Sequence, residues 1–240
     1  MYKTVNALVL REVKYKDADK ILTVLTEGDG KLTVKARGAL RKGSRCGAAA
    51  QMLCYSEMTL FESRGKWTAD EASTIEQFLP LRSDLEKLAL GTYFAELLET
   101  VSDEDSPNTA LLRLGLNSLY ALSLDLYPAE HIKAVFELRL MCLSGYTPDL
   151  DGAGELFSVG GGVVHSVETP PGVPGRSLPL GAAAKRAMRY VVDAEPKKIF
   201  SFEIPPEAEK QFCDICEAYV TAQLERNFGA LEYWKSIRIP

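Results

Sequence analysis

Six positively charged side chains lie close together in one window of the chain. No Asp or Glu occurs between Asp29 and Glu57, and the window holds Lys31, Lys35, Arg37, Arg41, Lys42 and Arg45. Lysine and arginine bind phosphate groups, and a cationic cluster on an acidic chain indicates a polyanionic partner. We predict that these six residues bind nucleic acid, mostly through its phosphate backbone. The alternative is a solvated run of charge without a partner.

Cysteine and histidine are too few and too scattered for most catalytic or metal chemistry. Cys213 and Cys216 form a CxxC pair, but the other three cysteines stand alone and there are only two histidines. A structural zinc site needs four such ligands. The pair falls on the apolar stripe of a helix, so we interpret it as buried core thiols, with a reactive thiol or a metal ligand as alternatives. We expect no catalytic residues, no metal and no cofactor, and therefore no enzyme.

The composition is that of a globular protein whose charge is unevenly distributed. Of 240 residues, 46% are hydrophobic and 25% are charged, which excludes general disorder. Residues 1–80 carry 13 Lys+Arg and 10 Asp+Glu, a net charge of +3. Because the whole chain has a net charge of −5, residues 81–240 carry a net charge of −8. No apolar run reaches the length of a membrane helix, and five cysteines fit a reducing compartment. We therefore expect a soluble cytoplasmic protein that does not bind membranes.

Residues 1–79 have the pattern of short strands. Runs rich in Val, Leu and Thr at residues 4–10 and 21–26 are followed by an Asp-Gly turn and the alternating segment 31–36. Two further runs, 52–62 and 66–75, flank a Ser-Arg-Gly turn. Five antiparallel strands predict a small barrel. Alternation places Lys31, Thr33 and Lys35 on one strand face, and the Gly-containing segment 37–45 is expected to be a long mobile loop.

From Pro80 onward the apolar residues repeat every three or four positions, which predicts helices. The first, over about 85–101, is expected to start at an N-cap Ser83 with Glu86 completing a capping box. Further helices are expected over about 109–124, 129–144, 181–192 and 206–227. The Gly- and Pro-rich segment 151–180 has room only for a short hairpin. The fold class is therefore α+β, with a barrel domain at 1–79 and a helical domain at 80–240.

Several short motifs, in order along nearly the whole chain, resemble the bacterial recombination-mediator family RecO. They are Ala7-Leu8-Val9-Leu10-Arg11, then the segments 15–21, 26–32 and 35–39, Ser44-Arg45, the segments 93–98, 136–140 and 143–150, and Trp234-Lys235-Ser236. The resemblance implies an N-terminal OB-fold followed by a helical domain. It also implies a non-enzymatic DNA-repair factor that binds single- and double-stranded DNA, anneals complementary strands and works with RecR to load RecA onto DNA coated by single-strand-binding protein.

This resemblance assigns roles to parts of the chain. The barrel face and the Arg37–Arg45 loop would contact DNA, and the protein would associate with the nucleoid. In the acidic helical domain, Lys133 and Arg139 are candidates to meet the acidic tail of single-strand-binding protein. Many RecO-like chains carry a four-cysteine zinc module after the Gly-Tyr-x-Pro-x-Leu stretch, but residues 151–160 contain no cysteine. We therefore predict that no zinc is bound there.

Two other classes of function fit the residues. An OB-fold barrel with a helical appendage also suits an RNA-binding module, because such barrels bind RNA as well as DNA. If the cationic cluster is only solvated, the chain would instead be a protein-interaction scaffold.

Overall fold

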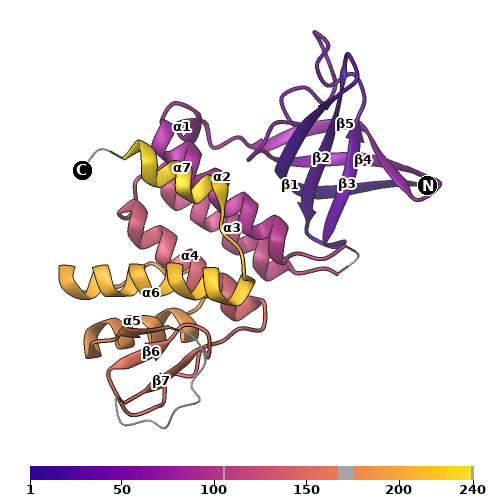
Figure 1. The fold of residues 1–240 in the computed structure, drawn as a ribbon. Helices are drawn as coiled ribbons and strands as arrows, with labels where there is room; N and C mark the ends of the chain where they lie inside the picture. The colour runs from indigo at the N-terminus through magenta and orange to yellow at the C-terminus, as the bar shows by residue number, and fades with distance from the viewer. Residues whose placement is uncertain (105, 167–175, 239–240) are drawn as a thin grey trace. The chain divides into compact units, whose positions relative to one another are not determined.

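The computed structural model describes residues 1–104, 106–166 and 176–238 (Figure 1). The chain forms two compact units, Met1–Leu124 with Gly229–Pro240, and Asp125–Phe228. The described strands are β1 Tyr2–Tyr15, β2 Asp19–Thr26, β3 Lys31–Ala36, β4 Tyr55–Ser63, β5 Lys66–Glu76, β6 Leu156–Ser158, β7 Val163–His165 and β8 Ser177–Pro179. The described helices are α1 Leu79–Arg82, α2 Leu85–Val101, α3 Thr109–Ser123, α4 Ala129–Leu143, α5 Ala182–Asp193, α6 Pro206–Leu224 and α7 Gly229–Ile237.

The first five strands form a closed barrel in the order β1-β2-β3-β5-β4 (Figure 1). Alternate side chains point inward, so that Leu32 and Val34 of β3 join a core with Met58 and Leu60 of β4. The prediction of an all-antiparallel barrel is wrong at one point, because β3 pairs with β5 in parallel. Closure needs this pairing, since it leaves neither β3 nor β5 as an unpaired edge.

Helices α2 and α3 pack on the barrel within the first unit. Both helices contact β2, and α2 also contacts β1 and α7. A Cβ atom at Gly115 of α3 would lie 2.7 Å from Leu98 Cδ1 of α2, so a larger residue there would require the Leu98 side chain to shift. At the β2–β3 turn Gly30 has a φ of +66°, and a Cβ there would lie 2.7 Å from the Ser106 carbonyl oxygen. The glycine therefore lets the chain after α2 close onto the barrel.

Two helix ends differ from the prediction. The N-cap of α2 is Asp84 rather than Ser83, because the Asp84 side chain accepts a hydrogen bond from the Lys87 N–H. The helix predicted over about 206–227 is α6, which ends three residues earlier, and α7 beyond it was not predicted. Glu225, the C-cap of α6, takes the left-handed conformation with a φ of 50°, which ends that helix before α7 begins at Gly229.

The second unit consists of α4, α5, α6 and a small sheet. All three helices contact one another, and the sheet has the order β7-β6-β8. The predicted hairpin at 151–180 is therefore a three-stranded sheet, with β8 added beside β6. Residues 167–175 of this predicted insertion lie outside the described residues.

The compact units do not coincide with the domains predicted at 1–79 and 80–240. Helices α1 to α3 group with the barrel because α2 and α3 pack on its strands. In the described part of the chain, each helix is too short or too polar to cross a membrane.

Candidate nucleic-acid interface

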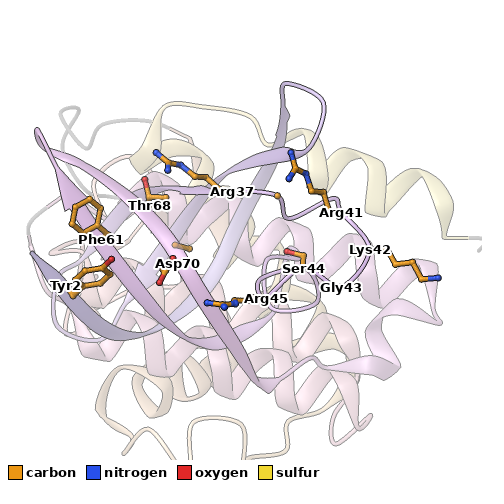
Figure 2. A pocket seen from close by; sticks show the side chains of 12 residues that line it. Tyr2, Arg37, Arg41, Lys42, Gly43, Ser44, Arg45, Phe61, Thr68 and Asp70 are labelled. Carbon is orange, nitrogen blue, oxygen red and sulfur yellow. The ribbon is translucent and has the colours of Figure 1, made fainter.

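Four of the six predicted cationic residues line one cavity on the outside of the barrel (Figure 2). They are Arg37, Arg41, Lys42 and Arg45, all exposed, and we call residues 37–45 the basic loop. The cavity has a volume of about 580 Å³ and its other wall comes from the outer faces of β1, β4 and β5. The arrangement is an open, positively charged hollow that can accept phosphate groups.

The basic loop is anchored to the barrel at several points, contrary to the expectation of a mobile loop. Its Ala39 side chain and the adjacent Cys46 are buried in the barrel core. The Leu40 N–H donates to the Ala18 carbonyl at 3.0 Å, and the Ala72 N–H donates to the Arg45 carbonyl at 3.2 Å. The barrel therefore holds the backbone of the loop in place and leaves its cationic side chains in solvent.

Lys31 and Lys35 lie outside the cavity and have other partners. The Lys31 ammonium donates to the Glu99 carbonyl oxygen of α2 at 2.8 Å. Lys35 Nζ lies 2.9 Å from Asp19 Oδ2 and 5.1 Å from the centre of the Tyr15 ring. The structure therefore brings together only Arg37, Arg41, Lys42 and Arg45 of the six, while Lys31 and Lys35 bind within the protein.

Asp19 connects Lys35 to the basic loop. Its Oδ1 accepts a hydrogen bond from the Gly38 N–H at 2.8 Å, while its Oδ2 pairs with Lys35. The Gly38 hydrogen bond and the Lys35 ammonium favour the charged carboxylate, and they lower the pKa of Asp19 from its usual value. Lys35 thus supports the start of the loop indirectly.

The cavity is also lined by Tyr2, Phe61 and Asp70, which were not predicted from the sequence as site residues. Tyr2 of β1 and Phe61 of β4 lie opposite each other in the strand register, with ring centroids 4.9 Å apart. Asp70 of β5 adds a carboxylate to the same wall. The alternation of Val5 inward with Tyr2 outward could have indicated the direction of the first ring, but the pairing with Phe61 depends on the barrel closing.

The side chain of Lys133, which was predicted to contact a partner, is buried. Only 3% of the residue is exposed, and its ammonium lies 2.9 Å from both Glu137 Oε1 and Glu217 Oε2. Burial alone would lower the pKa of Lys133, but the two carboxylates outweigh it and the net pKa is raised. An ammonium enclosed in this way cannot reach an acidic peptide without opening the α4–α6 contact.

Arg139 is also occupied within the second unit. Its Nη1 donates to the carbonyl oxygens of Val191, at 3.0 Å, and Val192, which lie in the last turn of α5. These carbonyls have no partner inside the helix, so the guanidinium acts as a C-terminal cap. The structure thus gives Arg139 a role in joining α4 to α5.

Cys213 and Cys216 lie on α6 with their thiols packed into the protein. Cys216 is fully buried, and the Cys213 thiol donates to the Glu130 carbonyl at 3.6 Å. Burial, followed by the neighbouring Glu209, raises the pKa of Cys213 to about 12. Both observations agree with core thiols. Among the described residues, no three or more His, Cys, Asp or Glu side chains gather in a way that could hold a metal ion.

A closed five-stranded barrel with this strand order is an OB-fold, a class of domain that binds oligonucleotides and oligosaccharides. Two family models match the chain, "Recombination protein O N terminal" over residues 1–78 and "Recombination protein O C terminal" over residues 82–232. The chain therefore belongs to the RecO family, and its role lies in DNA repair and recombination.

Individual relatives with the same name align with this chain over nearly its full length. The chain is 31% identical to the DNA repair protein RecO of Acetivibrio thermocellus, with 98% of this chain and 97% of the relative covered. It is 29% identical to that of Alkaliphilus metalliredigens, with 95% and 97% covered. It is also 29% identical to that of Symbiobacterium thermophilum, with 98% and 97% covered.

Proposed function

We propose that this protein binds single- and double-stranded DNA through the basic loop and promotes annealing of complementary strands. The observation that carries the proposal is the clustering of four exposed cations around one cavity of an OB-fold barrel. Membership of a family of recombination mediators supports DNA as the polyanion. The proposed activity involves no bond-making or bond-breaking step.

Annealing brings two polyanions together, and a cationic surface lowers their mutual repulsion. Each phosphate that the protein neutralises releases condensed counterions from the DNA, so binding weakens as salt rises. For about four to six phosphates, log affinity for single strands falls against log salt with a slope of about −3 to −4. Little sequence preference is expected, because phosphate contacts carry no direct sequence information.

The direct test is annealing of two complementary oligonucleotides, one carrying a fluorophore and the other a quencher. The protein is expected to accelerate the loss of fluorescence at about 50 mM salt and to lose most of this effect at about 200 mM. A scrambled second strand controls for aggregation. No acceleration at the lower salt would contradict the proposal. Competition between DNA and RNA of the same sequence tests the RNA-binding alternative, which equal or tighter RNA binding would favour.

Asp70 provides a second test, because its carboxylate lies in the cationic cavity where it opposes bound phosphate. Asp70→Asn is expected to tighten binding of single-stranded DNA about two- to fivefold, as for an exposed charge interaction of about 0.5–1 kcal/mol. Fluorescence anisotropy at low salt measures the change. Asp193→Asn, which alters net charge equally at the end of α5, is the matched control. Weaker binding by Asp70→Asn would show that phosphate does not occupy this cavity.

The partners belong to the same proposal. RecO-family membership makes RecR, RecA and single-strand-binding protein the partners to test, with RecA loading onto coated DNA as the outcome. Association with the nucleoid would follow from DNA binding. Because Lys133 is buried and Arg139 already donates to two carbonyl oxygens, we expect an acidic tail peptide to bind through other residues.

A further inference from the structure

Two aromatic rings lie in the open at the edge of the cationic cavity. Tyr2 is 64% exposed and Phe61 38% exposed, and their planes are 44° apart with centroids 4.9 Å apart. Figure 2 shows the two rings side by side at one end of the cavity and Arg41 and Lys42 at the other. Exposing two large rings in contact forgoes the free energy that burying them would supply.

We propose that Tyr2 and Phe61 form a stacking platform for an unpaired nucleobase, while the basic loop holds the sugar–phosphate backbone of the same strand. This inference rests on the proposed function and goes beyond it, because it predicts how the protein distinguishes single strands from duplex. Bases offer a flat face to an aromatic ring only when they are unpaired and unstacked. Phosphates, by contrast, are accessible on both forms of DNA.

The position of the two rings fits a DNA single strand that crosses the outer faces of the β-strands β1, β4 and β5. Many OB-folds bind their ligands on the face of strands two and three. Here the lysines of β3 are engaged within the protein, Lys31 with the Glu99 carbonyl and Lys35 with Asp19. Helices α2 and α3 also contact β2. The outer faces of β1, β4 and β5 carry the rings and border the basic loop, so they offer both chemistries that a single strand needs.

The two parts of the site should therefore be separable by mutation. Removing the rings takes away base stacking and leaves the phosphate contacts of the basic loop in place. Single-strand affinity should then fall while duplex affinity stays, since duplex binding uses the backbone alone. A purely structural role of the rings predicts equal losses for both ligands together with lower thermal stability.

The experiment compares three ligands of equal length by fluorescence anisotropy: a single strand, the same strand with abasic residues at every position, and the duplex. The abasic strand keeps the phosphates and lacks the bases. The wild-type protein is expected to prefer the normal strand to the abasic one about tenfold per stacked base. The double variant Tyr2→Leu with Phe61→Leu should lose this preference and keep its affinity for the abasic strand and for duplex.

Matched variants make the result specific to stacking. Tyr2→Phe retains an aromatic ring and should keep the preference, as should Tyr120→Leu, which removes an exposed tyrosine from α3. Should the double variant unfold, the single variant Tyr2→Leu, at the exposed start of β1, gives the same comparison. A preference that survives loss of the rings overturns the platform and leaves the proposed function standing. Absence of salt-sensitive binding in the wild-type protein removes both.

Discussion

Replacing Arg41, Lys42 and Arg45 together by alanine is expected to weaken binding of single-stranded DNA about 30- to 100-fold at about 0.1 M salt. The reason is that three exposed cations of the cavity wall are lost. Each phosphate contact removed flattens the dependence of log affinity on log salt by about 0.7, so three contacts flatten it by about 2. The loss should be equal for all sequences, and annealing should slow in parallel.

The measurement is a salt titration of oligonucleotide affinity by anisotropy, with thermal unfolding to check the fold. A matched control is the triple variant Arg113→Ala, Arg186→Ala and Lys197→Ala, which changes net charge equally at exposed positions outside the cavity. The control should shift the affinity by less than about threefold, since long-range charge acts weakly through screening salt. If the control weakens binding as much as the loop variant, only net charge matters and the cavity is not the DNA site.

Lys133→Ala is expected to destabilise the second unit by about 3–5 kcal/mol. The substitution leaves Glu137, which is fully buried, without the ammonium that lies 2.9 Å from it. A buried carboxylate that loses its opposite charge keeps the cost of lost hydration and loses the attraction that offset it. Because the cavity lies in the first unit, affinity for single-stranded DNA by the folded protein should stay within about twofold of wild type.

Urea unfolding followed by circular dichroism measures this loss. Lys198→Ala is the matched control, since its pair with Glu195 spans 3.6 Å between two exposed side chains and should contribute under about 1 kcal/mol. The double variant Lys133→Met with Glu137→Leu should recover much of the stability, because it removes both buried charges. A loss below about 1 kcal/mol in Lys133→Ala would mean that water reaches Glu137 and that Lys133 is available to partners after all.

Local patterns along the chain were sufficient to predict much of this molecule. The alternation in Lys31–Ala36 placed Leu32 and Val34 inward, and the three- and four-residue spacing after Pro80 predicted helices close to α2, α3, α4 and α5. The absence of acids beside the basic loop predicted its cationic character, and the interpretation of the Cys213-x-x-Cys216 pair as core thiols holds fully for Cys216, while Cys213 is only half-buried. These features depend on residues within a few positions of one another, where side-chain periodicity sets direction.

Contacts between distant residues were decided only by the tertiary structure. Barrel closure brings Tyr2 beside Phe61 and pairs β3 in parallel with β5, and neither segment indicates its partner by itself. The packing of α4 against α6 places Glu217 beside Lys133. Lys133, which its charge would lead one to expect at the surface, is therefore buried. The sequence therefore determined most of the elements, apart from α1, β8 and α7, and showed which of them carry positive charge. Tertiary packing decided which of those charges remain exposed to solvent, because a charge is costly to bury unless an opposite charge lies beside it, as Glu137 and Glu217 do for Lys133.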